Sequence, residues 1–136
     1  MLTLGHVSEA LTGYQMAGGA QVITDAVIDS RIVIPGALFV ALPGARVDGH
    51  DFLEEAFARG AAAALIERDL PGDAGRGRLC DVVDLRAPVT HEQASRLTAP
   101  VCLRVENALT AMQTLARYWR NRLSLRLIAV TGSVGK

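Results

Sequence analysis

The residues at the carboxyl end of the chain have the types and spacing that suit phosphate binding. An apolar run, Leu127–Val130, leads into the loop Thr131-Gly-Ser-Val-Gly-Lys136. Glycines let backbone N–H groups turn toward phosphate oxygens, and a lysine adds a point charge to the outer phosphates. The candidate phosphate-binding residues are therefore Thr131, Gly132, Ser133, Gly135 and Lys136.

The loop departs from the strict phosphate-loop pattern, so a second interpretation stays open. The pattern asks for Gly where Val130 stands and for Ser or Thr after the lysine, where this sequence stops. By spacing alone the segment also fits a plain turn that leaves a strand and ends in a solvated lysine. Lys136 is the only lysine beside thirteen arginines, and it falls where the loop needs one. An unrelated small phosphate-loop nucleotide binder is thus one hypothesis.

Composition narrows the class of protein. A chain of 136 residues, half of them apolar, can bury one core. Acidic and basic residues balance at 14 each, so no overall field holds nucleic acid or an anionic membrane. No stretch approaches the roughly 20 apolar residues that a membrane span requires, and the amino terminus has no basic leader. We expect a monomeric, cytoplasmic protein.

The cysteines and histidines give no metal signal. Cys80 and Cys102 lack the ligand spacing of a zinc site, and we expect both to be buried free thiols. His50 lies between aspartates, but three adjacent residues rarely converge on one ion. We therefore expect no metal site, and Asp48 and Asp51 fit turn and helix-cap roles at least as well as ligand contacts.

The elements that must position these residues alternate between helix and strand. Three helices are predicted: one between a Thr3 cap and Gly13, one capped by His50 or Asp51 and closed by Gly60, and Ala108–Leu123 capped by Asn107. The expected buried faces are Phe52, Leu53, Ala56 and Phe57 in the second helix, and Leu109, Met112, Leu115, Ala116 and Trp119 in the third.

Short β-branched or apolar runs predict the strands. They are residues 21–23, 26–30, 37–42, 61–66, 79–83, 101–105 and 125–130, with loops at 67–78 and roughly 85–100. Strands that alternate with helices indicate an α/β domain, here a small sheet flanked by helices.

Two segments in this order resemble a known family, the Mur ligases of peptidoglycan synthesis. Residues 29–52, DSRIVIPGALFVALPGARVDGHDF, look like the amino-terminal signature of the ligases that add the third residue and the terminal dipeptide to the peptide stem. Residues 131–136 resemble the opening of their ATP loop, whose shorter glycine pattern accommodates Val130 and continues into Ser or Thr. The resemblance covers nearly the whole chain, with residues 84–100 matched least.

Between the two ligases, the sequence resembles the one that adds D-alanyl-D-alanine (MurF type) more closely. The helix 108–123 with Tyr118-Trp-Arg120 and the Gly-Ser-Val-Gly loop carry that preference. The ligase that adds the third residue (MurE type), usually Gly-Thr-Asn-Gly in this loop, stays as the alternative.

The resemblance implies a division of labour between domains. Residues 1–124 would be an amino-terminal domain that binds the UDP end of UDP-N-acetylmuramoyl-peptide, and residues 125–136 would begin a central ATPase domain. ATP and Mg²⁺ would serve the full-length enzyme, and D-alanyl-D-alanine would be its second substrate. The 136-residue chain by itself would bind no cofactor and would be inactive. Apart from the beginning of the ATP loop, it would contain no catalytic residue.

The resemblance also implies where the UDP group binds. Ser30 would hydrogen-bond the uridine or diphosphate portion, and a loop would wrap the uracil and diphosphate. Arg31 or Arg46 would add a charge-assisted contact, although Arg31 also fits a simple pair with Asp29. The expected UDP-binding residues are Ser30, Arg31, Gly44, Ala45, Arg46, Val47 and Asp48.

Overall fold

The computed structural model describes residues 2–13, 19–68, 81–88 and 100–122. The predicted strand 125–130 and the phosphate loop 131–136 lie outside this part of the chain. The described helices and strands follow one another as α1 (Leu4–Thr12), β1 (Ala26–Val27), η1 (Ser30–Ile32), β2 (Leu38–Val40), η2 (Gly49–Phe52), α2 (Leu53–Ala58), β3 (Ala63–Ile66), β4 (Asp81–Asp84), β5 (Val101–Arg104) and α4 (Ala108–Arg122), where η marks a 3-10 helix.

The described strands form one parallel sheet, as the α/β prediction requires. Their order is β1-β2-β3-β5-β4, and each adjacent pair is parallel. The central strand β3 pairs Ala63 with Leu38 on one side and with Val101 on the other. Because parallel strands point the same way, the segments that follow all five strands emerge at one edge of the sheet. We call it the carboxyl edge.

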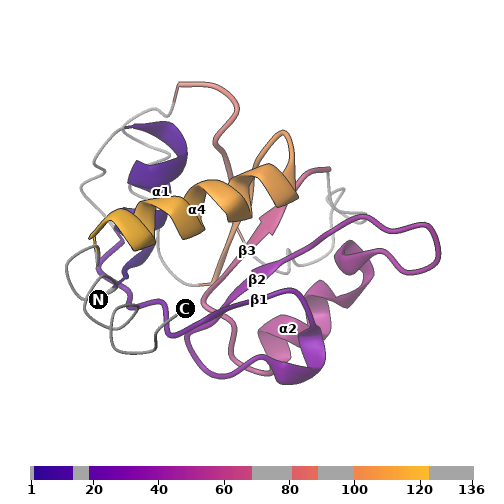
Figure 1. Cartoon of the computed structure of the whole chain (residues 1–136). Helices are drawn as coiled ribbons and strands as arrows, with labels where there is room; N and C mark the ends of the chain where they lie inside the picture. The colour runs from indigo at the N-terminus through magenta and orange to yellow at the C-terminus, as the bar shows by residue number, and fades with distance from the viewer. Residues whose placement is uncertain (1, 14–18, 69–80, 89–99, 123–136) are drawn as a thin grey trace, which may run out of the picture.

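Alternate residues of the central strands face two separate apolar cores. Leu38, Val40, Ala63, Leu65 and Leu103 pack beneath α1 and α4, whereas Phe39, Ala64, Ile66 and Cys102 pack against α2. Figure 1 shows α4 lying across one face of the sheet beside α1, with α2 on the other face. A sheet covered on both faces explains why its strands read as continuous apolar runs.

Helix α1 has the boundaries that the sequence predicts. The Thr3 hydroxyl accepts a hydrogen bond from the backbone N–H of His6, and the His6 ring accepts one from the N–H of Thr3, which completes a reciprocal cap. Gly13 ends the helix with φ of 81°, the left-handed conformation that glycine adopts without strain.

The buried face of α4 is rotated from the predicted one. Ala108, Ala111 and Leu115 are buried, whereas Leu109 is 47% exposed and Ala116 is also exposed. Met112 and Trp119 are half-buried and line an apolar cleft beside Val22 and Leu38. Small alanines allow the helix to approach the sheet closely, so the face chosen by packing is not the one with the largest side chains.

The other elements depart from prediction mainly at their ends. Helix α2 starts later than expected, after a 3-10 turn capped by Asp48, so neither His50 nor Asp51 caps it, and Phe52 is 37% exposed. Strand β1 ends at Val27 because the Asp29 carboxylate accepts the Arg31 N–H and starts a 3-10 turn. Of residues 21–23, Val22 makes an isolated antiparallel bridge to Thr3.

Cys102 corrects the expectation of free thiols. It is fully buried in β5, as predicted, but it is disulfide-bonded, and its partner lies outside the described residues. Among the described residues, no helix is long and apolar enough to cross a membrane.

Two leucines on α4 provide a matched test of this packing. Leu115→Ala should lower the free energy of unfolding by about 2–5 kcal/mol, because Leu115 is 6% exposed and its loss leaves a cavity. Leu109→Ala should change it by less than about 1 kcal/mol, since that side chain is half in solvent and alanine suits a helix. Urea denaturation measures both values, and equal losses would contradict the assignment of the buried face.

Candidate functional site

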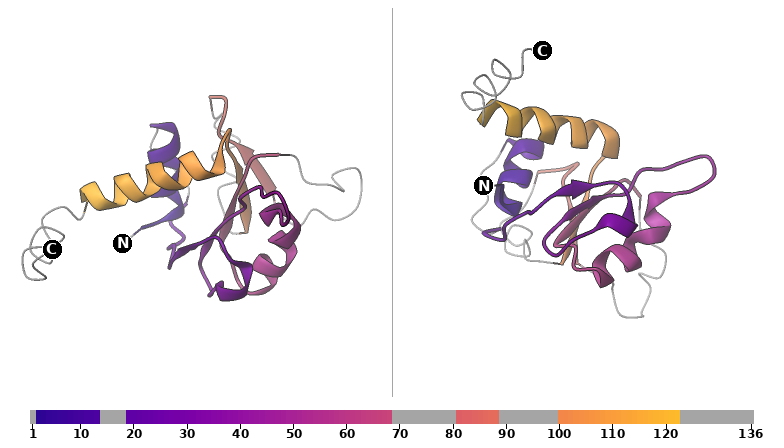
Figure 2. Two further views of the ribbon diagram at one scale, coloured as in Figure 1. Left: turned by 45° about the vertical axis from the view of Figure 1, so that its right-hand side comes forward. Right: turned by 60° about the horizontal axis from the view of Figure 1, so that its bottom comes forward.

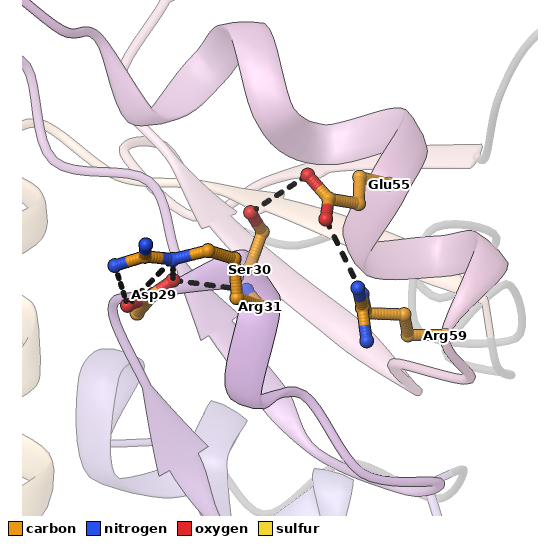
Figure 3. A network of polar contacts seen from close by, with 5 residues as sticks. All are labelled: Asp29, Ser30, Arg31, Glu55 and Arg59. Atoms are coloured by element: carbon orange, nitrogen blue, oxygen red, sulfur yellow. Dashed lines mark hydrogen bonds and ion pairs between the residues drawn. The ribbon is translucent and has the colours of Figure 1, made fainter.

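Ser30 lies just beyond the end of β1, where its hydroxyl is tied to α2. The residue is 6% exposed, and its Oγ donates a hydrogen bond to Oε2 of Glu55 at 3.1 Å. The other carboxylate oxygen of Glu55 accepts a bond from Nε of Arg59 at 3.3 Å (Figure 3). The carboxylate therefore accepts the hydrogen bond from the hydroxyl group, which leaves the lone pairs of Oγ free to accept a bond from a further donor.

Arg31 is engaged by Asp29 on the outer side of the same turn. Its Nε and Nη2 lie 3.0 and 2.8 Å from the two carboxylate oxygens, and the guanidinium side chain is 80% exposed (Figure 3). The side-chain and backbone hydrogen bonds from Arg31 lower the pKa of Asp29 to about 2. The simple ion pair that the sequence allowed is thus present, and a phosphate group would have to share Arg31 with Asp29.

The same Asp-x-Arg turn occurs after β4. Asp84 accepts the Arg86 backbone N–H at 2.9 Å and pairs with its guanidinium at 2.7 Å, and the Arg86 hydrogen bonds lower the Asp84 pKa against a smaller effect of burial. Because no ligand role was expected at β4, the repeat favours a turn-forming role for the Asp29–Arg31 pair.

The expected uracil and diphosphate loop leaves β2 and projects from the body of the fold (Figures 1 and 2). Its residues Gly44, Ala45, Arg46 and Val47 are exposed. The loop turns so tightly that a side chain on Gly44 would collide with the carbonyl oxygen of Val47. At its base the Gly49 N–H donates to the carbonyl of Leu42 at 2.8 Å, and a Cβ on Gly49 would lie 2.7 Å from the Leu42 nitrogen.

Asp48 closes the loop with several polar contacts. Its Oδ1 lies 2.9 Å from the His50 backbone nitrogen and 2.7 Å from His50 Nδ1, and its Oδ2 pairs with Arg68. Partial burial raises the pKa of Asp48, but the His50 hydrogen bonds and the positive charge of Arg68 outweigh burial and hold the pKa below its ordinary value. Asp48 therefore has the turn and cap role that the sequence left open.

The two sides of the candidate site share one support, helix α2. Both η1, which carries Ser30, and η2, which follows the loop, pack against it. Within the described residues Arg46 makes no ion pair, so its exposed guanidinium is better placed than that of Arg31 to meet an added anion. A seated hydroxyl, an open loop of backbone amides and an arginine suit the binding of a nucleotide phosphate.

Two glutamates that hold residues of the site in place were not predicted from the sequence. Glu55 binds Ser30 across 25 positions, and Glu67 binds both His50 and the first residue of α4. No local pattern marks either glutamate, because each pairing depends on the fold. Both ring nitrogens of His50 are occupied, and the described residues contain no group of three or more His, Cys, Asp or Glu that could hold a metal ion.

Comparison with known proteins identifies the family. The family model described as "Mur ligase family, catalytic domain" matches residues 22–120, which is most of the chain. The chain therefore belongs to the Mur ligase family. Residues 131–136, the predicted ATP loop, lie beyond the matched range.

Individual relatives and structures agree with that family. The chain is 35% identical to the UDP-N-acetylmuramoyl-tripeptide–D-alanyl-D-alanine ligases of Treponema pallidum and Escherichia coli, over 100% and 99% of its length. It is 40% identical over 88% of its length to a UDP-N-acetylmuramoyl-L-alanyl-D-glutamate–2,6-diaminopimelate ligase of Geobacillus kaustophilus. Two crystal structures of MurF from Acinetobacter baumannii share the fold, with TM-scores of 0.53 and 0.54 at 23% and 21% identity.

The chain is much shorter than these relatives. It covers 27% and 24% of the two D-alanyl-D-alanine ligases, 19% of the diaminopimelate ligase and 21% of each Acinetobacter structure, in the last case with 87–88% of its own residues aligned.

The ion pair between Asp29 and Arg31, on either side of Ser30, can be tested by titration. Asp29 should ionise with a pKa of about 2, and Arg31→Gln should raise this pKa toward the ordinary 3.8 because the side-chain hydrogen bonds from the Arg31 guanidinium are lost. Since the folded-state pKa is lowered, the stability that the pair contributes is present above about pH 4 and is lost as pH falls toward 2. Carboxyl NMR shifts measure the pKa, and Arg59→Gln, which removes a weaker and more distant charge, is the control.

Proposed function

We propose that residues 1–124 bind the UDP end of UDP-N-acetylmuramoyl-tripeptide in a ligase that adds D-alanyl-D-alanine, and that residues 125–136 begin its ATPase domain. The observation that carries the proposal is the match of essentially the whole chain to two such ligases. The diaminopimelate ligase has higher identity but matches a smaller part of the chain, so it supports the MurE-type alternative less.

The reaction proposed for the whole enzyme is amide formation driven by ATP. The γ-phosphoryl group passes to the terminal carboxylate of the tripeptide, which gives ADP and an acyl phosphate. The amine of D-alanyl-D-alanine then attacks the carbonyl carbon, phosphate leaves, and the amine loses a proton. Lys136, its loop and Mg²⁺ would neutralise the transferred phosphoryl group, and the remaining parts of the enzyme would supply the other catalytic groups.

The part of this work assigned to the described residues is binding. Ser30 Oγ, with its proton directed to Glu55, would accept a hydrogen bond from the uracil ring N–H or from a ribose hydroxyl. The amides of Gly44–Asp48 and the guanidinium of Arg46 would hold the diphosphate, with Arg31 as a shared contact. Because the chain has no net charge, the affinity for the diphosphate would have to come from local hydrogen bonds and charges rather than from a long-range field.

Amine selectivity tests the proposed substrate. The full-length protein should release phosphate when given ATP, UDP-N-acetylmuramoyl-tripeptide and D-alanyl-D-alanine. It should turn over UDP-N-acetylmuramoyl-dipeptide with diaminopimelate at least about 100-fold more slowly, because unpaired polar groups reject the wrong substrate strongly. The reverse preference would establish the MurE-type alternative.

The 136-residue chain alone should have no ligase or ATPase activity, and measurable turnover by it would contradict the proposed division of labour between domains.

Ser30→Ala tests the binding role directly. In the full-length enzyme it should raise KM for the UDP substrate about 3- to 10-fold through the loss of one hydrogen bond, with KM for ATP unchanged. Ser8→Ala is the matched control, since Ser8 is the other buried serine of the described residues and lies on α1. An unrelated phosphate-loop nucleotide binder predicts ATP affinity in the 136-residue chain and no effect of Ser30→Ala.

A further inference from the structure

His50 is a buried histidine whose two ring nitrogens have different, fixed partners. Its side chain is 1% exposed. Nε2 lies 3.0 Å from the backbone nitrogen of Glu67, and Nδ1 lies 2.7 Å from Oδ1 of Asp48. A backbone N–H can only donate, so Nε2 must keep its lone pair, and the ring proton must sit on Nδ1, directed at the carboxylate. The fold thus selects one neutral tautomer.

This histidine is the middle of a chain of hydrogen bonds along the carboxyl edge. Glu67, the residue after β3, donates its backbone N–H to the ring and accepts the N–H of Ala108 through Oε2 at 2.7 Å. Asp48, the last residue of the loop, accepts from both the ring and the backbone N–H of His50. The series Asp48–His50–Glu67–Ala108 therefore joins the end of the loop to the central strand and to the first turn of α4.

We propose that His50 is a positioning residue that holds the loop Gly44–Asp48 in its substrate-binding shape, an inference that rests on the proposed function. The exposed tip of the loop gains little from packing, so its direction depends on its base. There the Gly49 N–H holds one contact with Leu42, and His50 holds Asp48 from within the core. Because the ring is buried, it acts on the substrate through Asp48 and makes no contact of its own.

Two substitutions separate the two ends of the ring. In His50→Asn the amide nitrogen stands where Nδ1 was and can donate to Asp48, but nothing reaches the Glu67 N–H. In His50→Gln the amide oxygen stands where Nε2 was and can accept from Glu67, but the donor to Asp48 is lost. Each variant keeps one hydrogen bond, so a loss of stability alone should affect both to a similar degree.

The inference predicts an asymmetric effect on the full-length enzyme. His50→Gln should raise KM for UDP-N-acetylmuramoyl-tripeptide about 10-fold or more, with kcat and KM for ATP little changed, because the lost bond is to a charged acceptor. His50→Asn should raise the same KM by no more than about 3-fold. Equal KM values for the two variants, or a larger rise for His50→Asn, would overturn the positioning role.

A double-mutant cycle protects the test against misfolding of one variant. Asp48→Ala removes the acceptor and leaves His50 in place, so adding His50→Gln to it should raise KM no further. Additive effects would show that His50 does not act through Asp48. The ring ¹⁵N shifts of His50 in the unmodified enzyme should report a protonated Nδ1, and a protonated Nε2 would contradict the inference without any substrate.

The outcomes also separate this inference from the proposed function. If the unmodified enzyme turns over the UDP substrate but the His50 variants show no asymmetry, the positioning role alone is wrong. If it does not use UDP-N-acetylmuramoyl-peptides at all, the proposed function is wrong and the positioning role is wrong with it.

Discussion

The structure depends on two hydrogen bonds that Glu67 makes directly after the central strand β3, one to helix α4 and one to His50. The first N–H groups of a helix have no partner within the helix, and the first residue of α4, Ala108, is fully buried. The Glu67 carboxylate accepts one of them, where a negative charge also suits the helix dipole, and Asn107 accepts another from Thr110 at 2.8 Å. The backbone N–H of the same glutamate binds His50. One residue thus fixes α4 to the sheet on one face and the base of the loop at the edge.

A parallel sheet with strands of two to four residues leaves most of the polar chemistry to its carboxyl edge. Strand interiors carry only apolar side chains, which fill the two cores, and the polar groups follow directly after the strands. Three aspartates there, Asp29, Asp48 and Asp84, each bind an arginine and a backbone N–H nearby. These pairs shape the turns, so the groups that remain open to a ligand are few. Among the described residues of the proposed site, they are the Ser30 oxygen, the loop amides and Arg46.

The sequence predicts the local features well and the long-range ones poorly. The Thr3 cap, the Gly13 end of α1 and the Asn107 cap of α4 follow from contacts within a few residues, and all three are present. Five of the predicted apolar runs contain strands, whereas residues 21–23 form only an isolated bridge. The predicted face of α4 is confirmed at Leu115 and wrong at Leu109, because helical spacing does not say that the sheet prefers Ala108 and Ala111 to Leu109. The sequence does not predict the network around His50, because Glu67 lies 17 residues from His50 and Ala108 lies 41 residues from Glu67 along the chain. For the site, the sequence indicated which residues could bind UDP, but only the fold distinguishes Arg31, already paired, from Arg46.

The same distinction bears on how the proposed site could hold a diphosphate, given that this chain has no net charge. An exposed loop that must be ordered by its ligand loses affinity to conformational entropy, roughly 1–2 kcal/mol for each backbone residue fixed. Anchoring Asp48 and Gly49 before the ligand arrives removes part of that cost, and it leaves only the short tip Gly44–Val47 to be arranged on binding. In the proposed binding mode, preorganisation at the base would compensate for the absence of net charge on this chain, and a buried neutral histidine suits that base because it adds no charge to the carboxyl edge.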